Sequence, residues 1–331
     1  MRSFWRTVDP STRSLITALC VAVAVAGMSY GATAVAAGFP LWFPVVLGVL
    51  VLAAGSEFLF IGIVAAGGSP LAALCAGLLI NARHIGYGLA VPAVLGTGWR
   101  GLRDAHLLND ETVAVALAQP TAERGRAAYL ACGAGILAVW PGGALLGGLL
   151  GNAVPDPGVF GVDAVFPAVL LGLIMPALRD PTVLRGAFAG AALALLTTPL
   201  LPPGLPILLV HDGRRLRDST GGDTMNDLGY LLGAALALAA ATFAFRVAGP
   251  VLGSRITVSA RTTALLESAS VVVLTALVCT TALTEDGAAA GIARPAGVVA
   301  AGVLYRLRAP LPAALMAAAA TTAALRLAGV P

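Results

Sequence analysis

The sequence predicts an all-α membrane protein, a polytopic bundle of about 10–11 transmembrane helices. Composition is the first reason: 58% of the residues are hydrophobic and only 11% are charged, against about 25% in a soluble protein. The second reason is that apolar stretches recur from end to end, with a mean hydropathy of +0.91. Every basic residue is an arginine, and the arginines are scattered over loops. That scatter indicates membrane topology and no nucleic-acid partner.

The expected spans follow one another along the whole chain. The first apolar run is longer than the core of a signal peptide, so we expect an uncleaved helix. Four prolines between residues 199 and 206 should interrupt the sixth stretch. The expected segments are roughly 15–37, 41–66, 70–95, 127–151, 159–178, 182–210, 228–245, 264–283, 291–305 and 311–328.

A polar stretch divides the chain into two parts. Residues 211–225 are charged and glycine-rich, and Met225 begins a run that reads like the start of an independent membrane protein. We therefore expect a large membrane domain at 1–210, a polar linker at 211–225 and a small membrane domain at 226–331, as in a fusion of two ancestral subunits. An ordinary loop methionine is the alternative.

An inverted repeat and broken helices are considered for the N-terminal part. Residues 27–55 resemble residues 142–173 in the placement of glycine and of an aromatic–proline pair. Three spans in each unit would invert the second copy, a common plan in secondary transporters. Three plain spans before the arginine-rich loop 96–126 would set it opposite the N-terminus, against the positive-inside rule. A re-entrant or broken segment within 15–95 removes that conflict, and we expect the N-terminus inside.

Polar side chains interrupt two apolar stretches at hydrocarbon depth. Glu57 lies in the second stretch, and Asn81, Arg83 and His84 lie in the third. A charged group at the bilayer centre costs about 3 kcal/mol or more. An antiparallel helical hairpin would bring both groups to similar depths, within about 6 Å along the axis. Two interpretations stay open: a polar binding or coupling site, or a cluster that locks two helices together.

These residues also carry a family resemblance. The N-terminal part resembles the AzlC family, the large subunit of branched-chain amino acid exporters, and residues 226–331 resemble AzlD, the small partner. Glu57 stands where the family often has Gln, so a proton-carrying role is not implied by the resemblance; Phe243 replaces a Tyr. The matching motifs are Ser56-Glu57-Phe58, Asn81-Ala82-Arg83-His84, Asp110-Glu111-Thr112 and Thr242-Phe243-Ala244-Phe245-Arg246.

The resemblance implies a secondary transporter in the cytoplasmic membrane that exports leucine, isoleucine and valine, with methionine as a further candidate. The implied mechanism is alternating access. A transporter of another small hydrophobic solute and a non-transporting membrane scaffold are the alternatives. An intramembrane enzyme is the least favoured, because no nucleophile arrangement or HExxH pattern occurs.

The main site candidates are the four buried polar residues. Arg83 suits the substrate carboxylate, since a guanidinium makes bidentate contacts with carboxylates; an ion pair with Glu57 is the alternative. Glu57 suits the substrate ammonium or a coupling proton. His84 can titrate near neutral pH or serve as a hydrogen-bonded helix residue. Asn81 suits a polar contact to an amino acid.

Four further residues are secondary candidates. Ser56 accompanies Glu57 in its motif. Asp110 and Glu111 follow a loop of mixed charge, and a solvated helix start is their alternative role. Arg246 lies at a helix end, where reaching the membrane interface is the alternative.

The remaining expectations concern cofactors and partners. The three histidines are far apart and the four cysteines form no CxxC pair, so we expect no metal. No phosphate-binding glycine loop occurs, and no cofactor is expected. The expected partners are an amino-acid substrate, the lipid bilayer and a coupling proton; a homo-oligomer stays open.

Overall fold

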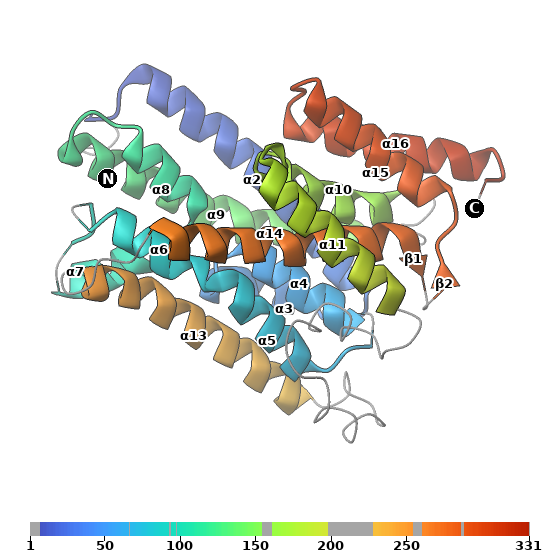
Figure 1. The fold of residues 1–331 in the computed structure, drawn as a ribbon, viewed down its shortest axis with the longest axis horizontal. Coiled ribbons are helices and arrows are strands. Elements are labelled where there is room, and N and C mark those ends of the chain that lie inside the picture. Colours follow the sequence, from blue (N-terminus) through green and yellow to red (C-terminus); the bar gives the residue numbers. More distant parts are fainter. Residues whose placement is uncertain are drawn as a thin grey trace.

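The fold is a bundle of helices, shown in Figure 1 from a computed structural model that describes residues 7–65, 67–92, 94–96, 98–153, 161–197, 228–253, 260–285 and 288–330. The first part holds α2 (Pro10–Ala36), α3 (Trp42–Leu50), α4 (Ala54–Ala65), α5 (Pro70–Asn81), α6 (Arg83–Ala90), α7 (Gly98–His106), α8 (Asp110–Leu117), α9 (Ala122–Ala153), α10 (Val162–Ile174) and α11 (Pro181–Thr197), with a 3-10 turn at Ala177–Arg179. The second part holds α13 (Leu228–Gly253), α14 (Ala260–Leu283), β1 (Thr284–Glu285), β2 (Ala288–Ala289), α15 (Ala293–Arg306) and α16 (Leu311–Leu327). The predicted linker at 211–225 and the prolines at 199–206 lie outside the described residues.

Three of the described helices are long and apolar enough to cross a membrane: Pro10–Ala36, Ala122–Gly151 and Leu228–Leu252. The other apolar helices are shorter, and several pair into hairpins. The predicted all-α membrane bundle is confirmed. The expected segments recur as helices, but 41–66 and 70–95 are each divided in two.

Side-chain caps begin several of the helices. Asp9 starts α2 and Ser69 starts α5, each accepting the backbone N–H three residues on and each followed by proline at the first helical position. Asn109 starts α8 in a capping box with Thr112. These caps replace hydrogen bonds that a helix start lacks, and the prolines have no N–H to leave unpaired.

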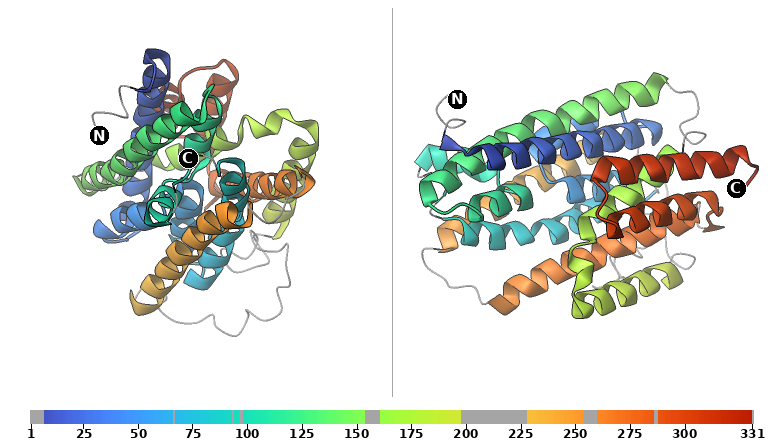
Figure 2. Two further views of the ribbon diagram at one scale, coloured as in Figure 1. Left: turned by 90° about the vertical axis from the view of Figure 1, so that its left-hand side faces the viewer. Right: turned by 90° about the horizontal axis from the view of Figure 1, so that it is seen from above.

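The two longest helices of the first part, α2 and α9, lie side by side and run in the same direction (Figure 2, right). A Cβ at Gly31 would collide with the backbone of Ala144, and one at Gly147 with the backbone of Met28. Glycine therefore permits this close backbone approach. Because the segments paired by the expected repeat run parallel, the likeness between 27–55 and 142–173 does not take the inverted form.

α2 and α9 run in the same direction because α3 and α4 fold back as a hairpin instead of forming one span. The Phe43 ring near the start of α3 lies 6.3 Å from that of Phe60 in α4, while a Cβ at Gly48 would contact the Glu57 carboxylate. Each of these contacts pairs residues that lie at nearly equal distances before and after residue 52, which is the pattern of an antiparallel hairpin. Leu52, at its tip, has φ 49, a left-handed conformation that is rare for a branched side chain. This re-entrant hairpin, which enters and leaves the bundle at the same end, is a break within 15–95 of the kind that the arginine placement predicts.

The next segment crosses the bundle with a break. α5 packs antiparallel to α4, and α6 continues after a junction at Ala82. Positions 77 and 88 face Leu238 and Gly249, so α5 and α6 run parallel to α13. α7 and α8 then lie at the same end of the bundle as the start of α2 (Figure 1), where Gln119 donates to the Thr12 hydroxyl at 3.4 Å.

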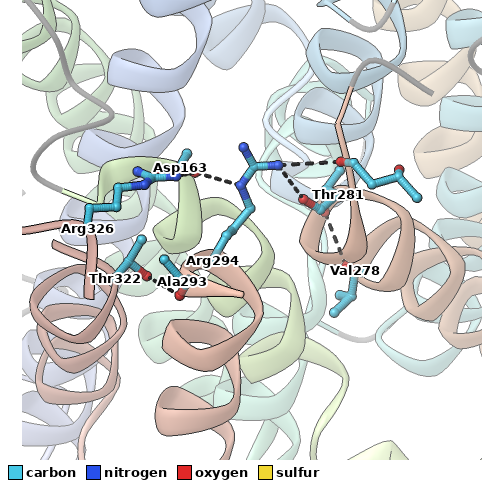
Figure 3. Close-up of polar contacts among 8 residues, drawn as sticks. Asp163, Val278, Thr281, Ala293, Arg294, Thr322 and Arg326 are labelled. Atoms are coloured by element: carbon cyan, nitrogen blue, oxygen red, sulfur yellow. Dashed lines mark hydrogen bonds and ion pairs between the residues drawn. The ribbon is translucent and has the colours of Figure 1, made fainter. Parts of the chain in front are cut away.

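The second part packs around the first through α13, α14 and the antiparallel hairpin of α15 and α16. Figure 3 shows Asp163, at the start of α10, between two arginines of that hairpin. Arg326 donates to both Asp163 oxygens at 2.7 Å, and Arg294 Nε donates at 2.6 Å. Asp163 thus joins the two parts of the chain.

Candidate functional site

The hairpin of α4 and α5 brings the predicted residues together. Ser56 and Glu57 lie in the first turn of α4, Asn81 ends α5, and His84 lies in the first turn of α6. All four are fully buried. The relative depths expected from the sequence are confirmed by a direct hydrogen bond of 2.8 Å from Asn81 Nδ2 to the Ser56 hydroxyl.

Asn81 connects α5 to three other helices. Besides Ser56, its Nδ2 donates to the Thr242 hydroxyl of α13 at 2.7 Å, and its carbonyl oxygen lies 2.8 Å from His84 Nδ1. Since a carbonyl only accepts, Nδ1 carries the proton in that bond and Nε2 is left free. Among the described residues, Asn81 Oδ1 and His84 Nε2 are buried without a hydrogen-bond partner. Thr242 was expected only as part of a family motif.

Glu57 is held by two N–H donors. Its Oε1 accepts from the Ala53 backbone N–H at 2.8 Å, and its Oε2 accepts from Trp140 Nε1 at 2.9 Å. Trp140 comes from α9, 83 residues further on, and sequence reasoning did not single it out. Arg83 lies 3.8 Å from Asp110, not against Glu57. The alternative ion pair between Arg83 and Glu57 is therefore not formed in the described part of the chain.

Arg246 points into the protein rather than out of it. It is fully buried, and its guanidinium donates to the carbonyl oxygens of Leu52 at 2.7 Å and His106 at 3.0 Å. Leu52 lies two residues after the end of α3, and His106 is the last residue of α7. Carbonyl groups at such positions lack partners within a helix. Arg246 thus provides hydrogen-bond donors for two backbone carbonyl groups of the first part of the chain.

A cavity of about 170 Å³ lies beside this network. One water needs about 10–15 Å³ of such volume, so the cavity has room for on the order of ten waters. That is in the size range of an amino acid. Its lining combines charged groups of both signs with apolar side chains. The polar lining is Arg83, His84, Asn109, Asp110 and Glu111; the apolar lining is Leu19, Ala22, Val23, Ala26, Leu52, Ala53, Ala54, Gly55, Phe58, Ile136, Trp140 and Val169.

The predicted residues divide into two groups by their relation to this cavity. Those in its wall are Arg83, His84, Asp110 and Glu111. Those outside the lining are Ser56, Glu57, Asn81 and Arg246, which join the helices that form it. The buried polar cluster thus contains both residues that line the cavity and residues that join helices.

The cavity wall includes the start of α4. Ala53, Ala54 and Gly55 line it, and a helix start presents partially positive N–H groups. Arg83 Nε and His84 Nε2, both buried without a partner, belong to the same wall. Such a wall can bind an anionic group. In the described ranges, no three His, Cys, Asp or Glu side chains are placed to hold a metal ion.

Comparisons with known families match both parts of the chain. Residues 18–154 match the model of the AzlC protein family. Residues 231–326 match the model of the branched-chain amino acid transport protein AzlD. No curated protein and no solved structure matches the chain. The first match contains every lining residue of the cavity given above except Val169, and the second contains Thr242 and Arg246.

Proposed function

The chain is a fused AzlC–AzlD protein, and we propose that it is a secondary transporter that exports branched-chain amino acids across the cytoplasmic membrane. Leucine, isoleucine and valine are the proposed substrates, with methionine as a further candidate. The two families are transport families, which supports a transporter over an enzyme. The domains proposed are 1–210 and 226–331, joined by 211–225.

The cavity carries the proposal, because its lining combines charged groups of both signs with apolar side chains, and a hydrophobic amino acid needs both. A zwitterion needs a cationic and an anionic group close together, and Arg83 lies 3.8 Å from Asp110. Arg83 and the start of α4 suit the carboxylate, since a guanidinium and helix N–H groups both bind carboxylates. Asp110 and Glu111 suit the ammonium. The apolar wall suits a branched aliphatic side chain.

The broken helices support alternating access. Transporters often bind substrate where helices are interrupted near the middle of the membrane, and here the Leu52 tip and the start of α6 both border the cavity. The Asp110 side chain is 42% exposed, so we propose that the cavity opens toward the end of the bundle with α7 and α8. By the positive-inside rule that end, with the N-terminus, is cytoplasmic.

Coupling to a proton or to the membrane potential is part of the proposal. Of the titratable groups expected from the sequence, His84 has a free ring nitrogen in the cavity wall, while both Glu57 oxygens are already bonded. We therefore propose His84 as the group that exchanges the proton. Leucine transport that does not respond to an imposed pH gradient or potential contradicts this part.

Growth on leucine-containing dipeptides tests export. A host without its own exporters accumulates leucine from such dipeptides and stops growing, and expression of this chain should restore growth. Arg83→Ala should abolish the rescue at an unchanged protein level. Arg100→Ala is the matched control, because Arg100 is exposed outside the cavity wall. No rescue by a well-folded wild-type chain favours another solute or a scaffold role.

A further inference from the structure

We propose that Glu57 and Arg246 act as one positioning unit, an ion pair bridged by the peptide group between Leu52 and Ala53. Arg246 donates to the carbonyl oxygen of that peptide group at 2.7 Å, and Glu57 accepts from its N–H at 2.8 Å. Both bonds are charge-assisted, and they bind the negative and the positive end of the same peptide dipole. No direct contact between the two side chains is required.

Burial makes the two charges dependent on each other. Glu57 and Arg246 are each fully buried, and a buried charge is tolerated when an opposite charge and hydrogen bonds compensate it. The other partners are the Trp140 N–H for Glu57 and the His106 carbonyl oxygen for Arg246. These are neutral groups. Removal of either charge therefore leaves the other without its nearest counter-charge across the peptide.

The peptide that they hold is the tip of the re-entrant hairpin. Leu52 has φ 49, a conformation that persists only when surrounding contacts impose it. Leu52 and Ala53 also line the cavity. The unit therefore sets the position of one cavity wall and of the start of α4, which makes Glu57 and Arg246 positioning residues rather than substrate ligands.

The unit also explains what the AzlD segment contributes to a cavity that none of its described residues lines. Arg246 belongs to α13 and acts on a peptide 194 residues earlier in the chain. From the same helix, Thr242 accepts a hydrogen bond from Asn81 at the end of α5. The small part thus holds two helix breaks of the large part in place.

A double-mutant cycle tests the unit in the full-length chain. The variants are Glu57→Gln, Arg246→Met and both together, with Arg246→Lys as the conservative replacement. Arg100→Met and Glu123→Gln are the controls, because both residues are exposed. The readouts are the thermal unfolding temperature in detergent, and KM and maximal rate for leucine in proteoliposomes.

The unit predicts that the double variant is less damaged than Arg246→Met alone. Arg246→Met should lower leucine transport about 100-fold, since it leaves a buried carboxylate uncompensated. The double variant should recover about tenfold of this, with a higher unfolding temperature. Arg246→Lys should be intermediate, chiefly through KM. If Arg246→Met does not accumulate, a folded double variant demonstrates the same coupling.

Two results overturn the proposal. One is that the losses of the single variants simply multiply in the double variant. The other is that Glu57→Gln alone abolishes transport without changing the unfolding temperature, as expected of a substrate or proton ligand. The transport readout rests on the proposed function, whereas the unfolding readout does not. A wild-type chain that moves no leucine therefore contradicts the function and still leaves the unit tested.

Discussion

Gly147→Ala should destabilise the bundle, although alanine normally favours a helix. Gly147 faces α2 from α9, and a Cβ there would collide with the backbone carbonyl of Met28. Backbone atoms cannot move aside as a flexible side chain can. The two helices must therefore separate along their contact, which frames the cavity through Ala26 and Trp140.

The magnitude follows from two opposing terms. Replacement of glycine by alanine within a helix gains about 0.5–1 kcal/mol. Overpacking a tight contact costs about 1–3 kcal/mol, and the upper half applies here because the collision is with backbone. The expected net loss is about 1–2.5 kcal/mol.

Gly142→Ala is the matched control, since Gly142 lies in the same helix and nothing lies within 4 Å of the position of its Cβ. This variant should be as stable as the wild type or more so. The assay is thermal unfolding of both purified variants in one detergent. If Gly147→Ala is as stable as Gly142→Ala, the close parallel packing of α2 and α9 is refuted.

Two other predictions concern the apolar wall of the cavity and the buried Asp104 of α7. Ala26→Leu fills the apolar wall, so transport of leucine should fall about tenfold more than transport of valine; equal losses in competition assays contradict this wall. Burial alone would raise the pKa of Asp104, but hydrogen bonds from Arg103, the Gly96 N–H and Arg126 outweigh it and lower the pKa. The ionised Asp104 therefore stabilises the fold above about pH 4, and this stabilisation is lost as the pH falls through the lowered pKa of Asp104 in the folded state. Asp104→Asn should therefore unfold at a lower temperature than wild type at pH 7, with the gap closing below about pH 4; a pH-independent gap contradicts this.

Spacing alone predicted the meeting of the two buried polar groups. The turn between α4 and α5 is short and the rise per residue of a helix is fixed, so Ser56 and Asn81 had to lie at similar depths. Arginine placement also predicted a re-entrant or broken segment before loop 96–126. Both arguments use geometry that does not depend on distant residues.

The tip of the re-entrant hairpin could not be located from the sequence. The run around Leu52 has no proline and reads as one continuous apolar span. What permits the break is an arginine that comes much later in the chain, Arg246, together with the carboxylate of Glu57. For the same reason Trp140 was missed as a partner of Glu57, because long-range contacts between helices leave no local signal.

The most direct test is counterflow of labelled leucine into proteoliposomes containing wild type, Arg83→Ala or the control Arg100→Ala. We expect uptake by wild type and by the control, and none by Arg83→Ala, since the guanidinium is proposed to bind the carboxylate in the cavity. Equal uptake by all three would move the binding site away from this cavity. No uptake by a folded wild type, with leucine or any other hydrophobic amino acid, would contradict the proposed transport.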